Sequence, residues 1–210
     1  MFWSRRKKFR NLSLEEIKGK ARILFIDDED RKDIIDYLFN SGWKCRQLFE
    51  KDFLSLDQID IEDSDIICVD INGVGEKLGK KNGLDIVQSI KTQAPEKKII
   101  IYSSQSSQNV FHPAVDLADK KILKSAGDFE VFKNNIEELA LKTFSWDGIV
   151  KTTYEEVKPF WNGDLTIEKY EKLLVKGCSK KDVEVNDIIA LLKVSVSVGN
   201  LILDGVKIFL

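Results

Sequence analysis

The feature of this sequence that most constrains its fold is a series of short apolar runs that alternate with segments of helical periodicity. Five segments suit β-strands: residues 23–26, 43–49, 66–69, 99–102 and 121–123. The stretches that follow them suit helices: residues 30–41, 51–58, 83–93, 108–118 and 128–142. Apolar strands that alternate with helices are typical of a parallel sheet covered on both faces. The sequence therefore predicts an α/β fold, with a five-stranded, doubly wound parallel sheet within residues 21–144.

The N-terminal segment differs from this pattern. Residues 1–20 form a polar lead-in that contains a basic run at residues 5–10. The basic run is either a solvated terminus or a contact for an acidic partner or an anionic surface. The spacing of Ser13 and Glu16 matches a capping box, so we expect a short helix to begin there.

The C-terminal segment, residues 145–210, predicts a small and mainly helical extension. A first helix is expected at 149–160, broken by proline, and a second is expected to be capped by Thr166. A last helix begins near Val185 and carries apolar residues as far as Val198, although the alternation at the end of this run also allows a strand. The chain stays apolar to its last residue, so we expect this end to pack on the α/β domain or on a second copy as a homodimer.

The composition suits a soluble globular protein and argues against two classes of partner. The 210 residues are 43% hydrophobic and 32% charged, enough for one domain with a small appendage. The net charge is −2 and the C-terminal segment shows no basic stripe, which argues against nucleic-acid binding. Lys193, Asp204 and Lys207 interrupt the apolar C-terminal stretch, which argues against a membrane span.

The cysteines and the N-terminus predict a reducing compartment. Cys45, Cys68 and Cys178 lack the spacing of metal ligands, and their odd number argues against a disulfide framework. No apolar segment follows the basic N-terminus in the way that a signal peptide requires. We therefore expect a cytoplasmic protein.

Polar side chains occur at four of the predicted strand ends. They are Asp27 and Asp28 after the first strand, Asp70 after the third, Ser103 and Ser104 after the fourth, and Lys124 after the fifth. The carboxyl ends of parallel strands meet at one edge of a doubly wound sheet, and ligands bind there. Each group alone is common as a turn or helix cap, but the ordered set predicts one cleft lined by three carboxylates, hydroxyls and an ammonium group.

This set of groups suits phosphoryl transfer to a carboxylate. Crowded carboxylates repel one another, and a divalent cation such as Mg²⁺, which prefers oxygen ligands, relieves that repulsion. With the metal bound, Asp70 can attack phosphorus while Lys124 and a hydroxyl neutralise the transferred group. No histidine or glutamate in the set is placed as a general base, which disfavours hydrolysis of a large substrate.

The same residues make the sequence resemble the receiver domain of two-component response regulators over roughly residues 21–144. The motifs that carry the resemblance are Ile23-Leu-Phe-Ile-Asp-Asp-Glu29, Ile66-Ile-Cys-Val-Asp-Ile-Asn72, Ile99-Ile-Ile-Tyr-Ser-Ser104 and Ile122-Leu-Lys-Ser125. The resemblance implies a flavodoxin-like receiver fold. On the metal side, it implies that Asp27 and Asp28 are the acidic pair that binds Mg²⁺, together with Asp70 and the backbone carbonyl of Asn72.

The resemblance also implies roles on the phosphoryl side of the cleft. Asp70 corresponds to the phosphoacceptor and Lys124 to the lysine that pairs with the phosphoryl group. Ser103 corresponds to the hydroxyl that responds to phosphorylation, and Ser104 to the small residue after it. Gln105, like Asn72, lies where family members tune the lifetime of the phosphoaspartate.

The sequence departs from the family pattern at several positions. Ser125 replaces the proline that usually follows the lysine, and a cis bond without proline costs about 2.5–4 kcal/mol. Lys121 replaces the aromatic switch residue, and Tyr102 lies on a different strand. The loop at 73–83 is longer than usual and rich in glycine and lysine. His112, the only histidine, precedes a proline and suits a loop better than a phosphorylated helix.

The sequence thus predicts a response-regulator-like signalling protein. It accepts a phosphoryl group from a histidine kinase or phosphotransfer protein and signals through contacts with a protein output partner, without being an enzyme beyond slow self-dephosphorylation. Two alternatives stay open. One is a Mg²⁺-dependent phosphoryl-transfer enzyme with Asp70 as nucleophile, which Asn72 disfavours because such enzymes place an acid there. The other is a degenerate receiver that acts as a phosphorylation-independent interaction module.

Overall fold

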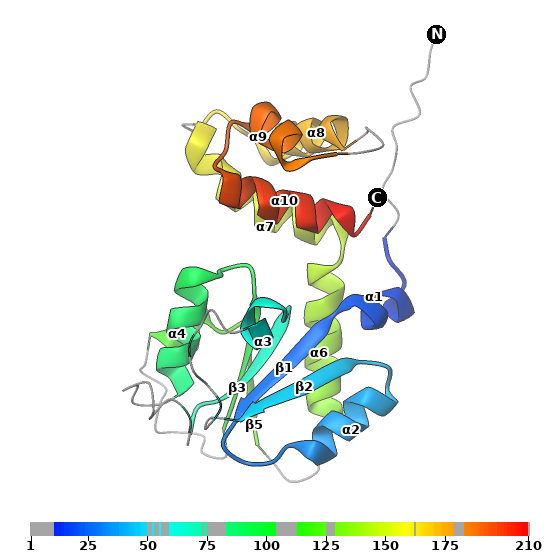
Figure 1. Cartoon of the computed structure of the whole chain (residues 1–210), viewed down its shortest axis with the longest axis vertical. Helices are drawn as coiled ribbons and strands as arrows, with labels where there is room; N and C mark the ends of the chain where they lie inside the picture. The colour runs from blue at the N-terminus through cyan, green and yellow to red at the C-terminus, as the bar shows by residue number, and fades with distance from the viewer. Residues whose placement is uncertain are drawn as a thin grey trace. The chain divides into compact units, whose positions relative to one another are not determined.

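The protein forms two compact units, one at Leu14–Ala140 and a second that contains Leu141–Leu210. Their architecture comes from a computed structural model (Figure 1). It describes residues 11–49, 52, 55, 59–72, 74, 83–103, 113–124, 129–161, 163–178 and 183–209. Each unit has a hydrophobic core of its own among these residues.

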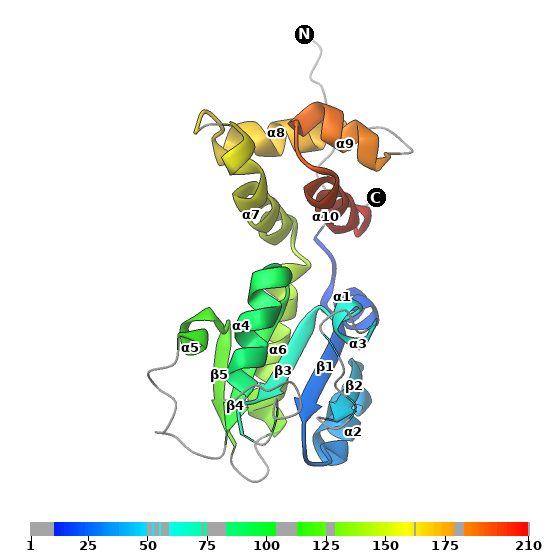
Figure 2. The same cartoon turned by 60° about the vertical axis from the view of Figure 1, so that its left-hand side comes forward.

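The first unit alternates strands and helices along the chain. Its described strands are β1 (Arg22–Asp27), β2 (Lys44–Phe49), β3 (Ile66–Asp70), β4 (Lys98–Ser103) and β5 (Lys120–Leu123). Its described helices are α1 (Leu14–Lys20), α2 (Lys32–Asn40), α3 (Ile59–Glu62), α4 (Gly83–Gln93), α5 (Ala114–Leu117) and α6 (Phe129–Thr143). Figure 2 shows the same elements from a second direction.

The five strands form one parallel sheet in the order β2-β1-β3-β4-β5. This is the flavodoxin-like order, in which the chain reverses its direction of winding between β1 and β3. The register places Ile26 beside Val69 and Asp70 beside Tyr102. The predicted α/β fold with a five-stranded, doubly wound parallel sheet is therefore confirmed.

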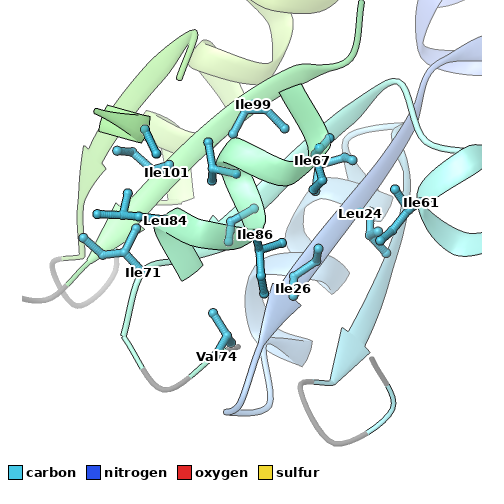
Figure 3. Close-up of a cluster of buried hydrophobic side chains, with 14 of the residues drawn as sticks. Leu24, Ile26, Ile61, Ile67, Ile71, Val74, Leu84, Ile86, Ile99 and Ile101 are labelled. Carbon is cyan, nitrogen blue, oxygen red and sulfur yellow. The ribbon is translucent and has the colours of Figure 1, made fainter. Parts of the chain in front are cut away.

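The two faces of the sheet are covered because its central strands are apolar on both sides. One cluster joins alternate residues of β1, β3 and β4, such as Leu24 and Ile67, to the buried side of α4, including Leu84 and Ile86 (Figure 3). On the opposite face, Phe25 of β1 contacts Phe132 of α6, with ring centroids 5.9 Å apart. A strand buried on both faces reads as a continuous apolar run, and this explains why β1 and β3 are recognisable from the sequence.

The described helices differ from the predictions mainly where the pattern was weak. The helix at 83–93 has the bounds that we expected, and α6 lies within one residue of its prediction at each end. The helix expected at 51–58 falls largely outside the described residues, and the described helix in this region, α3, begins at Ile59. The helix expected at 108–118 is reduced in the described residues to the four residues of α5, which follows Pro113.

The second unit is helical among its described residues, as predicted. It contains α7 (Trp146–Val157), the 3₁₀ helix η3 (Lys158–Trp161), α8 (Ile167–Gly177), α9 (Val185–Leu192) and α10 (Val196–Lys207). The Thr166 side chain caps α8 by accepting a hydrogen bond from the Lys169 backbone N–H, as expected, and Ser145 caps α7 in the same way. The core of this unit joins residues from all four α-helices, including the fully buried Tyr170 and Ile188.

The prediction of one last helix from Val185 to Val198 is wrong. The helix ends at Leu192, and Lys193 adopts a left-handed conformation with a φ of 57°. A new helix then begins with Ser195 as its cap, so the alternating segment at 194–198 is not a strand either. A left-handed residue ends a helix because the chain can no longer continue the right-handed turn.

Helices α9 and α10 meet in a specific geometry. Their axes differ by 115° across a three-residue connection, which is the arrangement of a helix-turn-helix. They approach closely at Gly199, where an added Cβ would lie 2.8 Å from Ile189 Cγ1. The exposed face of α10 carries Asp204 and Lys207, whose charges cancel.

Among the described residues, no single helix is both long and apolar enough to cross a membrane. Taken together, α9 and α10 have the length and apolar composition of a membrane span, but their axes are bent by 115°.

Candidate functional site

Three acidic side chains meet at the carboxyl edge of the sheet. Asp27 is the last residue of β1, Asp70 is the last residue of β3, and Asp28 follows Asp27. One carboxylate oxygen from each residue lies within 4.8 Å of the others. This edge lies next to the reversal between β1 and β3, where doubly wound sheets bind their ligands.

Asp70 is nearly buried and has a close cationic partner. Its residue is only 3% exposed, and the Lys124 ammonium Nζ lies 2.6 Å from its Oδ2. The Asn72 backbone N–H donates to the other oxygen, Oδ1, over 3.1 Å. Burial raises the pKa of Asp70, and the two donors only partly offset that effect. The lysine that follows β5 and the aspartate that ends β3 are thus brought together.

Ser103 and Asn72 also face one another at this edge. Ser103 is buried at the end of β4, and its Oγ accepts a hydrogen bond from the Asn72 Nδ2 over 2.7 Å. The backbone carbonyl of Ser103 accepts from the Lys124 backbone N–H over 2.6 Å. These contacts join the ends of three strands around Asp70.

Several of the predicted positions fall outside the described residues. They are Ser104, Gln105, His112, Ser125 and most of the loop at 73–83. Of that loop, the structure describes Val74, which is fully buried in the α4 side of the core, and Gly83, which begins α4.

Asp27 is completely buried and is held by several donors. The Arg31 guanidinium donates from Nε to Oδ2 over 2.5 Å, and the Tyr102 hydroxyl donates to the same oxygen over 2.7 Å. The Glu29 backbone N–H donates to Oδ1 over 2.9 Å. Burial alone would raise the pKa of Asp27, but these hydrogen bonds, led by that of Arg31, hold it below its usual value.

Asp28 differs from its neighbour in exposure and in charge environment. Its side chain is exposed to solvent at the rim of the cluster. Partial burial of the carboxyl group and the adjacent Asp27 carboxylate raise its pKa. Among the three carboxylates, Asp28 is therefore the most accessible to an ion that arrives from solution.

Two members of this site, Arg31 and Tyr102, were not predicted from the sequence. Arg31 lies four residues after Asp27, inside the segment at 30–41 that was predicted as a helix, and no role was assigned to it. Tyr102 belongs to an apolar run and looked like a core residue, which its ring is, because it contacts Phe25 and Phe132. Its hydroxyl nevertheless reaches the acidic cluster. A polar atom on a buried aromatic residue at a strand end was the available signal.

The oxygen donors of this cluster fit a hard divalent cation. Asp28 and Asp70 present carboxylate oxygens, which Mg²⁺ prefers as ligands. With Asp27 and Glu29, four carboxylates gather here, and the two cations Lys124 and Arg31 leave an excess of negative charge. Both oxygens of Asp27 already accept hydrogen bonds. Asp70 also accepts at both of its oxygens, from Lys124 and from the Asn72 N–H, so the exposed Asp28 is the carboxylate most available to an ion.

No protein-family profile matches this chain, and no curated protein matches it. Among solved structures, 164 chains are similar. The response regulator TrrA from Thermotoga maritima, solved in complex with Mg²⁺-BeF, shares 22% identity over 57% of this chain and 98% of its own, with a TM-score of 0.46. The BeF₃-activated receiver domain of Klebsiella pneumoniae RstA shares 19% over 57% of this chain and 98% of its own, with a TM-score of 0.45.

A third similar structure is TrrA in complex with the histidine kinase ThkA. It shares 22% identity over 57% of this chain and 97% of that chain, with a TM-score of 0.45. These similar structures are response regulator receiver domains, and the helical C-terminal unit has no named counterpart among them. The assignment of the fold rests on the strand order and register described above.

Proposed function

We propose that this chain accepts a phosphoryl group on Asp70 in a Mg²⁺-dependent reaction and signals through protein contacts. The observation that carries the proposal is the pairing of a buried Asp70 with Lys124 at 2.6 Å, beside two further carboxylates within 4.8 Å. A buried carboxylate that already has a cation next to it can become a phosphoaspartate without leaving its new charge unpaired.

The residues around Asp70 have distinct tasks in this reaction. A carboxylate oxygen of Asp70 forms the new O–P bond while the bond between phosphorus and the donor atom breaks, and the leaving group keeps that electron pair. Lys124 stays near the acyl phosphate and neutralises part of its charge. Ser103 offers a hydroxyl group to a phosphoryl oxygen once it exchanges its hydrogen bond with Asn72. Asp28, Asp70 and the Asn72 backbone carbonyl would hold a Mg²⁺ ion, which would neutralise further charge on the phosphoryl group.

The site favours acceptance over turnover. The residue two positions after Asp70 is Asn72, whose amide cannot act as a general acid toward a leaving group. Its side-chain amide also donates to Ser103 Oγ over 2.7 Å, which engages it with the hydroxyl at the end of β4. We propose a histidine kinase or phosphotransfer protein as the phosphoryl donor of this chain; the similar protein TrrA has been solved in complex with the histidine kinase ThkA.

The test is phosphoryl labelling of the full chain. With Mg²⁺ and a small phosphodonor such as acetyl phosphate or phosphoramidate, we expect intact-mass spectrometry to show one phosphoryl group that hydroxylamine removes. Asp70→Asn should abolish it, whereas Asp116→Asn, an exposed aspartate on α5, should leave it unchanged. Labelling that persists in Asp70→Asn would exclude this phosphoacceptor.

The same experiment separates the competing functions. Continuous release of phosphate from the donor over many turnovers would favour a phosphoryl-transfer enzyme. One observation favours the interaction module instead: the Arg31 guanidinium pairs with the Asp27 carboxylate, one of the three acids that a metal would use. In that case neither labelling nor beryllofluoride binding would occur at any Mg²⁺ concentration.

A further inference from the structure

The arginine beside Asp27 is placed as a built-in counter-ion of the acidic cluster. Its guanidinium contacts both oxygens of that carboxylate, with Nε 2.5 Å from Oδ2 and Nη2 3.4 Å from Oδ1. The same Nη2 lies 2.5 Å from Glu29 Oε2. Arg31 therefore bridges two of the negative charges that a metal ion would otherwise have to neutralise.

The backbone holds Arg31 in place for this contact. The Arg31 N–H donates to Gln47 Oε1 of β2 over 2.9 Å, and the Gln47 amide donates back to the Glu29 carbonyl over 2.6 Å. This reciprocal pair fixes the turn after β1 against the neighbouring strand. A fixed backbone reduces the entropy that the long side chain must lose to form the ion pair.

The ion pair with Arg31 supplies the counter-charge that the buried Asp27 carboxylate requires. Asp27 has no exposed surface, and a buried carboxylate without a partner is strongly unfavourable. Arg31 and the Tyr102 hydroxyl supply that compensation, while Lys124 lies farther away at 3.5 Å from Oδ2. The described structure thus satisfies the charge of Asp27 with groups of the chain itself.

We propose that Arg31 is a positioning residue that competes electrostatically with the divalent cation at this cluster and so lowers its affinity for Mg²⁺. The inference rests on the metal site of the proposed function. A cation that enters between Asp28 and Asp70 meets a guanidinium on the adjoining carboxylate, and like charges in a partly buried site repel strongly. Binding of the ion then requires Arg31 to withdraw from Asp27 or to tolerate that repulsion.

The experiment is isothermal titration calorimetry of the full chain with Mg²⁺, in the absence of phosphodonor. Arg31→Gln removes the charge but keeps amide donors, and we expect its Kd for Mg²⁺ to fall roughly tenfold below that of the wild type. Lys32→Gln is the matched control, because it removes the same charge from the next, exposed residue. We expect its Kd to stay within about twofold of the wild type, since exposed charges are screened.

A second measurement uses the wild-type chain and does not depend on how the variant folds. The Arg31 Nε–H group should give an NMR signal protected by the ion pair with Asp27, and saturation with Mg²⁺ should shift that signal. An unchanged signal, or equal Mg²⁺ affinities of Arg31→Gln and the wild type, would overturn the inference and leave the proposed function standing.

The remaining outcomes are also decisive. Weaker binding by Arg31→Gln would mean that Arg31 builds the metal site, which overturns competition. If neither the wild type nor Arg31→Gln binds Mg²⁺ at millimolar concentrations, both the inference and the metal-dependent function fail. Binding by Arg31→Gln alone would support the inference in its strongest form.

Discussion

The first residue of α4 offers the sharpest test of how the fold positions Asp70. Gly83 begins the helix, and its N–H donates to the Ile71 carbonyl over 3.3 Å. A Cβ added to Gly83 would lie 2.0 Å from the backbone oxygen of Asp70 and 2.8 Å from Val74 Cγ2. The substitution Gly83→Ala therefore presses a methyl group directly against the backbone of the residue that we propose as phosphoacceptor.

The size of the effect follows from these distances. Ordinary van der Waals contact begins near 3.4 Å, so the Asp70 carbonyl or the start of α4 must move by more than 1 Å. Neither can move alone, because both belong to the buried core. Overpacking of this kind costs typically 1–3 kcal/mol, and with backbone on one side we expect a loss of about 3 kcal/mol, or roughly 10 °C in Tm.

The matched control is a second helical glycine in the same unit. Gly19 in α1 has no atom within 4 Å of an added Cβ. Gly19→Ala should therefore raise the stability by about 0.5–1 kcal/mol, because alanine is the better helix former. Thermal and urea unfolding followed by circular dichroism would compare the two variants. If Gly83→Ala unfolds at or above the wild-type temperature, the close approach of α4 to Asp70 is refuted.

Three further predictions concern other groups. Tyr102→Phe removes the hydroxyl that donates to the buried Asp27 carboxylate, and we expect it to lower the free energy of unfolding by about 1.5–3 kcal/mol. Tyr170→Phe is the control, and it should lose only about 1 kcal/mol because its partner, the Thr153 hydroxyl, is neutral. Equal losses of unfolding free energy in urea denaturation would contradict this prediction. Burial raises the pKa of the Cys45 thiol to about 12. The rate of Cys45 alkylation, measured by peptide mass spectrometry, should therefore rise roughly tenfold per pH unit from pH 8 to 11. The alkylation rate of an ordinary thiol would level off above pH 9, and that result would contradict the prediction. Ser195→Ala removes the cap of α10 and should cost about 1 kcal/mol in thermal unfolding, and an unchanged Tm would show that the cap is dispensable.

The sheet and its site edge were predictable because one physical rule governs both. A strand buried on both faces must be apolar throughout, and the first polar residue after it must lie at the sheet edge. This rule places Asp27, which follows Ile26, and Asp70, which follows Val69, at the sheet edge. The register sets Ile26 beside Val69, so the two carboxylates lie together. The pattern of polarity along the chain therefore fixed both the strands and the position of the acidic cluster.

The break between the last two helices could not be predicted from the same pattern. The residues from Ile188 to Val206 remain apolar at helical spacing across the break, so the periodicity continues where the helix does not. The break occurs at Lys193, which takes a left-handed conformation that glycine or asparagine usually signals. The one local signal was Ser195, whose hydroxyl begins the next helix by capping Val198 N–H.

The partners of Asp27 illustrate a different limit of sequence reasoning. The resemblance located the acidic pair, but it assigned no contact with that pair to Arg31 or to the Tyr102 hydroxyl. Whether a carboxylate is paired depends on side-chain reach across elements, and Tyr102 lies 75 residues from Asp27 in sequence. Such contacts become visible only when the register of β1, β3 and β4 is known.

Tyr102 also changes how the missing aromatic switch residue should be understood. Lys121 occupies the expected switch position, where its side chain is exposed and lies 3.7 Å from Asp116. The aromatic ring is instead that of Tyr102, on the neighbouring strand β4. Its hydroxyl donates to Asp27, and the Lys124 Nζ lies 5.1 Å from the centroid of its ring. The ring also makes an edge-to-face contact with Phe132 of α6. Any shift of Lys124 toward a phosphoryl group on Asp70 therefore alters the surroundings of a buried ring that packs on α6. The ring of Tyr102 thus connects the lysine beside Asp70 to the helix that follows β5.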